Sequence, residues 1–267
     1  MSLFLLSAGT LWQREIVRFL RQRSRIVGAL GQPILFWLLL GAGFGNSFRA
    51  PEGGGSGNYL EYFYPGILAM VILFTAIFAT IAVVEDRKER FLQAVLVAPA
   101  PRAAIVLGQA LGATTLALLQ GLILLAAAPL AGVPLTLSSA AATAGIMALI
   151  GFALTSLGLV FAWRLDSTQG FHSIMNLVLL PLWLLSGAVF PALSAHPMLG
   201  WVMKINPLTY GVAALRRTLY AAQPGALDHL PGLGVSVAVT VLFGLAAFMA
   251  AVRYASRSDG YSHPNER

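Results

Sequence analysis

Residues 62–84 read YFYPGILAMVILFTAIFATIAVV, and residues 85–90, directly after them, read EDRKER. The first stretch is uncharged and long enough to cross the roughly 30 Å hydrocarbon core of a bilayer, which takes about 20 apolar residues in a helix. The second stretch is charged at every position, in a chain in which Asp, Glu, Lys and Arg make up only 10% of the residues. Together they predict a transmembrane helix that ends in water, at a charged surface.

The composition of the whole chain points the same way. Of its 267 residues 58% are hydrophobic, and a charged fraction of 10% is well below the roughly 25% typical of soluble domains. A globule of this size could not cover its surface with so few charges, so we predict an integral membrane protein. The chain has no cysteine, which excludes disulfides, thiolate metal sites and cysteine nucleophiles.

Six stretches are long and apolar enough to span a membrane, which predicts an all-α polytopic fold with six transmembrane helices. They lie near 26–45, 62–84, 103–130, 138–163, 171–193 and 232–254, with a Gly-Val-Pro turn at 132–134 between the third and the fourth. The interval 194–231 contains four prolines and several charges. Because proline interrupts regular helix, we expect an external segment with short helices there.

The distribution of Lys and Arg predicts the orientation, because basic residues collect in cytoplasmic loops. One side of the six spans holds Arg14, Arg18, Arg21, Arg23, Arg25, Arg87, Lys88, Arg90, Arg102, Arg164, Arg253, Arg257 and Arg267, and the other only Arg49, Lys204, Arg216 and Arg217. This places both termini in the cytoplasm. We expect a multi-pass protein of the plasma (inner) membrane. We expect a cytoplasmic amphipathic helix over 1–25, one membrane domain over 26–254 and a cytoplasmic tail over 255–267.

The N-terminal segment has helical periodicity. An apolar stripe and a basic stripe fall on opposite sides of it: the first is Trp12, Ile16, Phe19 and Leu20, and the second is Arg14, Arg18, Arg21 and Arg25. The pattern predicts a basic amphipathic helix lying in the cytoplasmic interface. Its arginines would bind anionic lipid, dock a cytoplasmic partner, or do both.

The charged run after the second span leads into a mostly apolar segment, 91–98, that stops at Pro99. If 85–98 is a short helix, Arg87 and Arg90 point one way, while Phe91 and Val95 point another. Such a helix with an apolar knob suits insertion into a groove on a partner protein. The alternative is a solvated turn that only marks the water boundary. A turn would not require the further apolar residues, which favours docking.

Several kinds of chemistry are missing. The only lysines are Lys88 and Lys204, so the chain has no phosphate-binding Gly-x-x-x-x-Gly-Lys-Ser/Thr loop. The histidines are scattered without metal-ligand spacing. Ser186 lacks a histidine deep in another span that could act as its base, and we interpret it as a small packing residue. No span interior carries Asp or Glu, which argues against an ion-coupled transporter.

Three segments together resemble the membrane subunit of an ATP-binding-cassette exporter of the type-2 permease class. They are 11–15, in the helix that leads into the first span; 90–99, after the second; and the set LSGAVFP (185–191), INPLTY (205–210) and LRR (215–217). The last set is the most specific, and it resembles the drug-export and nodulation-factor branch more than the polysaccharide branch. The resemblance covers nearly the whole chain, in order.

The resemblance implies the partners. Permeases of this class work in pairs, here expected to be a homodimer in membrane lipid, and each docks a separate cytoplasmic ATPase that binds ATP and Mg²⁺. This chain would bind no cofactor or metal and carry no catalytic residue. Its expected ATPase-coupling residues are Glu85, Asp86, Arg87, Lys88, Glu89, Arg90, Phe91, Val95 and Pro99. The N-terminal helix would brace the same junction through Arg14, Arg18 and Arg21.

The resemblance also implies a transport path along the second and fifth spans and an outer gate after the fifth. The expected path residues are Phe74, Phe78, Asn176, Leu180 and Trp183, although ordinary packing explains the aromatic ones equally well. The expected gate residues are Ser186, Gly187, Phe190, Pro191, Asn206 and Pro207. Because the proposed lining is apolar, the expected cargo of this ATP-driven, multidrug-type exporter is amphipathic or lipid-like.

Two other interpretations stay open. The chain could be a non-transporting membrane anchor that recruits cytoplasmic proteins through the same basic surfaces, or a lipid or polysaccharide exporter subunit. A lipid-modifying membrane enzyme is disfavoured, since the sequence offers no acid–base constellation. ATP turnover in a complex with an ATPase would distinguish a transporter from an anchor.

Overall fold

The structure is a computed structural model, and it describes residues 3–21, 31, 33–40, 43, 59–89, 91, 95, 100–189, 196–221 and 227–257. Regular structure in these ranges is helical throughout, as predicted. The long elements are α1 (Leu3–Arg21), α3 (Tyr59–Ala79), α4 (Ile81–Lys88), α6 (Arg102–Ala126), α7 (Leu137–Ala162), α8 (Thr168–Trp183), α9 (Pro197–Ile205), α10 (Pro207–Leu219) and α11 (Leu233–Arg257). Two short turns, the 3-10 turn η1 (Ala128–Ala131) and the π turn η2 (Leu184–Ala188), follow α6 and α8.

Within the described residues, five helical segments are long and apolar enough to cross a membrane. They are Tyr59–Lys88, Arg102–Ala126, Leu137–Ala162, Thr168–Ala188 and Leu233–Arg257, and they match five of the predicted spans. In the first predicted span, 26–45, the structure describes residues 31, 33–40 and 43, and all of these are helical. The structure therefore supports a membrane protein with several spans. The interval 194–231 holds the two short helices α9 and α10, as expected.

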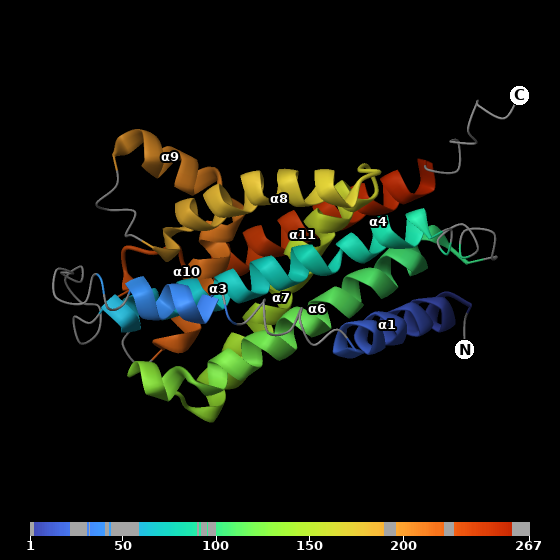
Figure 1. Cartoon of the computed structure of the whole chain (residues 1–267). Coiled ribbons are helices and arrows are strands. Elements are labelled where there is room, and N and C mark those ends of the chain that lie inside the picture. Colours follow the sequence, from blue (N-terminus) through green and yellow to red (C-terminus); the bar gives the residue numbers. More distant parts are fainter. Residues whose placement is uncertain are drawn as a thin grey trace, which may run out of the picture.

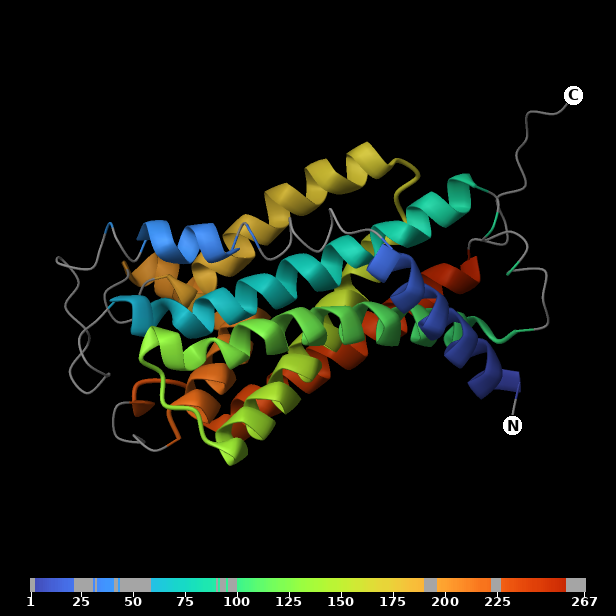
Figure 2. The same ribbon diagram turned by 60° about the horizontal axis from the view of Figure 1, so that its bottom comes forward.

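Helix α3 is the centre of the bundle. Every residue from Phe63 to Ile77 is buried, and the helix packs against α6, α7 and α8. Figures 1 and 2 show it running through the middle, with α6 and α7 on one side and α8 on another. A helix that is apolar on all sides has to be surrounded by other helices or lipid. The sequence YFYPGILAMVILFTAIFA therefore selects the central position.

Pro65 lies inside α3 and is accommodated by a side chain from another helix. Proline has no N–H, so it cannot donate the helical hydrogen bond to the carbonyl of Glu61. Tyr220, at the end of α10, donates its hydroxyl to that carbonyl at 2.8 Å. A second contact lies one residue further on, where Nε1 of Trp183 donates to the carbonyl of Gly66 at 2.8 Å. These two bonds attach α10 and α8 to the proline turn of α3.

The turn between α6 and α7 follows the predicted Gly-Val-Pro motif. Gly132 ends η1 with φ of +81°, a backbone conformation that favours glycine. Thr136 then caps α7: its Oγ1 accepts from the backbone N–H of Ser139 at 3.1 Å, and Ser139 Oγ accepts from the N–H of Thr136 at 3.0 Å. Such reciprocal caps satisfy donors that the first helical turn leaves free.

Helix α1 packs on α6 through a face that differs from the predicted apolar stripe. Its buried residues are Ala8, Leu11, Glu15 and Phe19, whereas Trp12 and Leu20 are exposed. The reason is on α6, where Gly108 and Gly112 let the two backbones approach closely. A Cβ at Gly108 would lie 2.6 Å from the carbonyl oxygen of Ala8, and one at Gly112 would lie 2.7 Å from Glu15 Cβ. Close approach over a Gly-x-x-x-Gly pair is a common way for helices to pack in membrane proteins.

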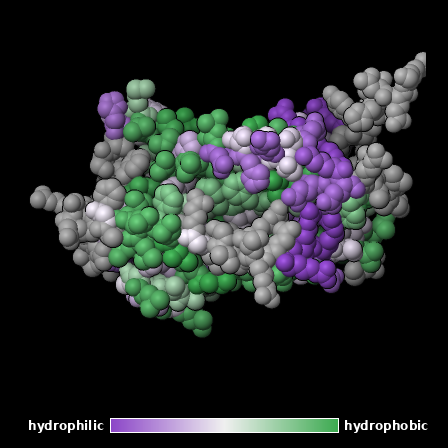
Figure 3. Space-filling model, viewed as in Figure 1, coloured by the Kyte–Doolittle hydropathy of each residue, from purple (hydrophilic) through white to green (hydrophobic). Residues whose placement is uncertain are grey.

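The surface separates by polarity. Figure 3 shows hydrophilic residues in a belt at the end of the bundle where α4 ends, and hydrophobic residues over much of the remaining face. We call this end, formed by the C-terminal half of α1, by 85–89 and by 163–168, the charged end. The short helices α9 and α10 lie at the opposite end (Figure 1).

Candidate functional site

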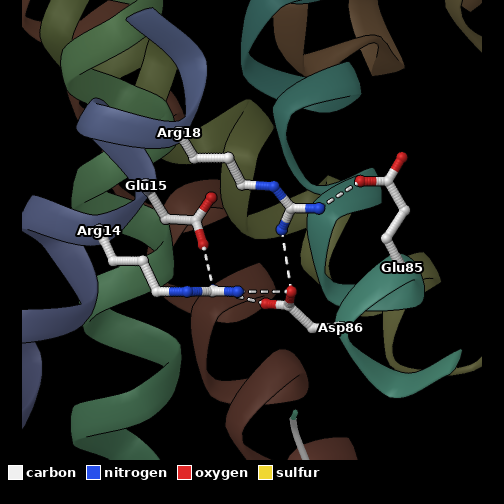
Figure 4. A network of polar contacts seen from close by, with 5 residues as sticks. All are labelled: Arg14, Glu15, Arg18, Glu85 and Asp86. Atoms are coloured by element: carbon white, nitrogen blue, oxygen red, sulfur yellow. Dashed lines mark hydrogen bonds and ion pairs between the residues drawn. The ribbon is translucent and has the colours of Figure 1, made fainter. Parts of the chain in front are cut away.

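Asp86 is the centre of an ion-pair network at the charged end. Arg14 approaches it with both Nη atoms, Nη1 lying 2.6 Å from Oδ2 and Nη2 2.7 Å from Oδ1. Arg18 adds a contact from Nη1 to Oδ1 at 2.9 Å and reaches Glu85 Oε2 with Nη2 at 2.7 Å. Figure 4 shows the two arginines of α1 pointing across to the two carboxylates of α4, with Glu15 beside Arg14.

Burial makes this network strong. The side chain of Asp86 is only 2% exposed, while those of Arg14 and Arg18 are 29% and 21% exposed. The hydrogen bonds that Arg14 donates to Asp86 raise the pKa of Arg14 above its usual value, against the opposing effect of its partial burial. Two-pronged arginine–carboxylate pairs combine strength with a fixed geometry. The network therefore fixes α1 to the end of the helix that forms the second predicted span.

Arg87 attaches the same end of α4 to the next pair of helices. Its Nη2 donates to the carbonyls of Ala162 at 3.2 Å and Trp163 at 3.1 Å, and its Nη1 lies 2.9 Å from Asp166 Oδ1. A cation at the last carbonyls of a helix interacts favourably with the helix dipole. Arg87 thereby caps α7 and positions the short connection between α7 and α8.

The predicted short helix over 85–98 needs a correction. Glu85 to Lys88 complete α4, which continues the second predicted span, so the charged run does not open a separate helix. Helix α4 ends at its C-cap Glu89, whose N–H donates to the carbonyl of Glu85 at 2.9 Å. The physical reason is that the ion pairs of Asp86 and Arg87 extend the helix beyond the apolar stretch. Phe91 and Val95 are both helical, whereas Arg90 and Pro99 lie outside the described residues.

The ion pairs divide the predicted coupling residues into two groups. Glu85, Asp86 and Arg87 have partners within the chain, whereas Lys88, Glu89 and Phe91 are exposed. The ring of Phe91 lies under the guanidinium of Arg14, with 3.9 Å from Cζ to the ring centroid, and remains 37% exposed. Val95 is partly buried against the core. We call Lys88, Glu89 and Phe91 the exposed tip.

A polar hollow borders the exposed tip. It has a volume of about 630 Å³ and lies between α4 and the N-terminal half of α8. Its lining includes Glu85, Lys88, Glu89, His172 and Asn176. Lys88 Nζ lies 3.4 Å from Thr168 Oγ1 across it. Lys88 and Glu89 thus belong both to the exposed tip and to the lining of this hollow.

The expected path residues divide between an exposed and a buried group. Asn176 and Leu180 are exposed on α8, whereas Trp183 is buried and donates its Nε1 to the carbonyl of Gly66. On α3 the rings of Phe74 and Phe78 contact each other with centroids 5.8 Å apart, and Phe78 also contacts His172 at 5.2 Å. The exposed face of α8 is thus polar near the charged end and apolar beyond it.

The expected gate residues form the junction of η2 and α10. Gly187 takes φ of +77°, which ends the helix of the fifth span, and Ser186 donates its hydroxyl to the carbonyl of Trp183 at 2.6 Å. Asn206 caps α10 by accepting from the N–H of Leu208 at 2.9 Å, and its Nδ2 donates to the carbonyl of Leu182 at 2.7 Å. Pro207 is the first residue of α10, while Phe190 and Pro191 lie outside the described residues.

Three contacts of this junction and of the charged end were not anticipated from the sequence. Asp166 pairs with Arg87 across 79 positions of the chain, and Arg216 donates to the carbonyl of Gly187 at 3.1 Å. The third contact is the close packing of α1 against Gly108. Only the last has a local signal, since Gly108 and Gly112 form a Gly-x-x-x-Gly pair within an apolar span. The other two contacts join residues far apart in the chain, and no local sequence pattern indicates them.

Comparison with known proteins gives a consistent result. A family model described as "ABC-2 type transporter" matches residues 7–220. Nodulation protein J of Rhizobium meliloti (strain 1021) is 29% identical over 210 residues, which is 77% of this chain and 78% of that protein. Nodulation protein J of Sinorhizobium fredii (strain NBRC 101917 / NGR234) is 26% identical over 246 residues, 90% of this chain and 89% of the relative. Inner membrane transport permease YadH of Escherichia coli (strain K12) is 28% identical over 222 residues, which is 81% of this chain and 84% of that protein.

Proposed function

The chain belongs to the ABC-2 type transporter family, and we propose that it is the permease subunit of an exporter driven by a separate ATPase. It acts as one of a pair of permease subunits, with both termini in the cytoplasm. Its cargo is an amphipathic or lipid-like compound, moved outward across the plasma membrane. The name of one relative, an inner membrane transport permease, supports transport as the activity.

The observation that carries this proposal is the rigid attachment of an exposed tip to a membrane-spanning helix. Lys88, Glu89 and Phe91 are exposed, while the two residues before them, Asp86 and Arg87, are each bound by other helices. A force applied by a partner to the exposed tip is therefore transmitted to α3, α1 and α7 together. A loop without such contacts would bend and would not transmit the force.

The same geometry supports a sequence of events. ATP binding closes the two partner ATPases and moves the exposed tips with them. Helices α3 and α8 then shift against their counterparts in the second subunit, so that a cavity open to the cytoplasm closes and opens outward. The break at Gly187 and the caps at Asn206 and Pro207 give the outer end discrete joints at which it can rearrange.

Co-purification tests this proposal. The tagged chain is extracted from its native membrane in mild detergent and assayed for bound protein and ATP hydrolysis. A stoichiometric ATPase that is lost in Phe91→Ala but retained in Leu242→Ala is expected, since Leu242 is 67% exposed on α11, outside the charged end. A chain that purifies alone and without nucleotide turnover contradicts the proposal and favours a membrane anchor.

A further inference from the structure

A second cavity lies at the end of the bundle opposite the charged end, beside the expected gate residues Ser186 and Gly187, and the proposed function assigns it no ligand. Its volume is about 620 Å³, and it is enclosed by η2, α9, α10 and the segment 229–231. Volumes of this order accommodate small organic ligands. Its lining is mostly apolar, with Trp201, Met203, Val212 and Leu230 among its residues.

Among the described residues, the cavity has basic side chains and no carboxylate. Lys204, Arg216 and His229 line it, and the lining includes neither Asp nor Glu. Arg216 is only 6% exposed. Its Nη2 donates to the carbonyl of Gly187 at 3.1 Å, and its Cζ lies 4.0 Å from the centroid of the Tyr62 ring. Within the described part of the chain, no ion pair joins Arg216 to a carboxylate.

A buried guanidinium without a carboxylate is costly, because burial removes hydration that a carbonyl and a ring replace only in part. Burial lowers the pKa of His229, and the positive charges of Arg216 and Arg217 lower it further, with Asp228 acting in the opposite direction. An anion in the cavity would compensate this excess of positive charge. Arginine is well suited to phosphate and carboxylate groups, which it binds with two parallel hydrogen bonds.

The wall of the cavity extends to an apolar surface. Helix α9 presents Met198, Trp201 and Ile205 to the outside, at 74%, 68% and 79% exposure. In a membrane protein, such a short helix with an exposed apolar face lies in the lipid interface. Lys204 lies beside Trp201, with Nζ 5.1 Å from the ring centroid. A ligand entering past α9 therefore meets apolar surface along its length and a cation at its end.

We infer that this cavity binds an anionic amphiphile, with a phosphate or carboxylate headgroup against Arg216 and an acyl chain against α9. The site belongs to this chain alone and needs neither an ATPase nor a second subunit. A failure to co-purify an ATPase would leave it intact, so its test is separate from that of the proposed function.

Native mass spectrometry of the delipidated full chain in neutral detergent tests the site. Phosphatidylglycerol and phosphatidylcholine with identical acyl chains are titrated separately. The first phosphatidylglycerol is expected to bind at least about tenfold more tightly than phosphatidylcholine, since the headgroup charge is the difference that Arg216 recognises. Arg216→Gln is expected to remove this preference. The matched control is Arg164→Gln, because Arg164 also lies over a tyrosine ring, 4.6 Å from that of Tyr254, but outside the cavity.

A cavity-filling variant covers the case in which Arg216→Gln does not fold. Gly200 lines the cavity, and a Cβ built on it has no heavy atom within 4 Å, so Gly200→Leu fits α9 while occupying the ligand's volume. It is expected to weaken phosphatidylglycerol binding without removing a charge. Equal binding of the two lipids, or a preference unchanged in both cavity variants, would overturn the inference. Displacement of phosphatidylglycerol by low-millimolar inorganic phosphate would overturn its amphiphile part, because the anion alone would then suffice.

Discussion

Asp86 holds Arg14 in a two-pronged ion pair, with Oδ2 2.6 Å from Nη1 and Oδ1 2.7 Å from Nη2. The pair joins α1 to the end of α4 across 72 positions of the chain. It turns the basic stripe of the N-terminal helix inward, to a carboxylate of the same chain. The sequence left two roles open for the basic stripe, anchoring by lipid and docking to a partner. Only residues that this network leaves exposed, such as Arg21, can take either role.

The pair should dominate the stability of the charged end. Asp86→Asn leaves two partly buried arginines without their main partner and should lower the free energy of unfolding by about 3 kcal/mol. In a double-mutant cycle with Arg14→Gln, the coupling energy should be about 1–3 kcal/mol. Unfolding of the detergent-solubilised chain by denaturant measures it. The control cycle uses Arg87→Gln and Asp166→Asn, whose carboxylate is 89% exposed, and should give less than about 1 kcal/mol. Similar coupling in both cycles would contradict the assigned importance of burial.

Phe91 should matter for coupling rather than for folding. Its ring is 37% exposed and lies against Arg14, so Phe91→Ala should lower the free energy of unfolding by no more than about 1 kcal/mol. We expect near-wild-type unfolding together with a roughly tenfold or greater loss of transport, because the variant loses the apolar contact that holds the ATPase. Transport and ATP hydrolysis are measured in the same proteoliposomes. Normal transport by this variant would exclude the role.

Gly108 should tolerate no side chain. A Cβ at this position would lie 2.6 Å from the carbonyl oxygen of Ala8 and 2.8 Å from Leu11 Cβ, so Gly108→Ala should displace α1 from α6 and destabilise the chain by about 1–3 kcal/mol. Gly145, on α7, has nothing within 4 Å of a Cβ. Gly145→Ala should therefore be neutral or stabilising by up to about 1 kcal/mol. Thermal unfolding of the two variants compares them, and equal shifts would mean that α1 is not packed as described.

Tyr220 should compensate for Pro65. Tyr220→Phe removes the hydroxyl that donates to the Glu61 carbonyl and should destabilise by about 1 kcal/mol. Pro65→Ala restores the backbone N–H that normally bonds to this carbonyl. The effect of Tyr220→Phe should therefore be smaller in the Pro65→Ala background. Chemical unfolding of the four chains measures this coupling, and additive effects would refute the compensation.

The helical framework was predictable because it depends on local composition. Five apolar stretches coincide with helices that the structure describes, and the Gly-Val-Pro turn and the short helices after the fifth span also appear where expected. Membrane helices are set by the apolar length of single segments, which a sequence displays directly.

The contacts that build the charged end were less accessible. The apolar stripe with Trp12 and Leu20 was predicted to face lipid, and both residues are exposed, but the face that packs on α6 consists of Ala8, Leu11, Glu15 and Phe19. The cause is the pair Gly108 and Gly112 on another helix, and periodicity within α1 contains no information about it. In the same way, the charged run at 85–90 indicated where the membrane span ends. It did not indicate that Asp86 and Arg87 find partners within the chain while Lys88 and Glu89 stay exposed.

Cross-linking from the exposed tip most directly tests the claim that this tip docks the ATPase. The chain has no cysteine, so a thiol reagent reacts only at the cysteine that is introduced into it. Glu89→Cys and the lipid-facing control Leu242→Cys are each treated in native membranes with a short thiol-to-amine reagent. The account predicts a product between the chain and a nucleotide-binding ATPase from position 89 and none from position 242. An ATPase that co-purifies with the chain but gives no product from position 89 would contradict the claim that the exposed tip is its docking site.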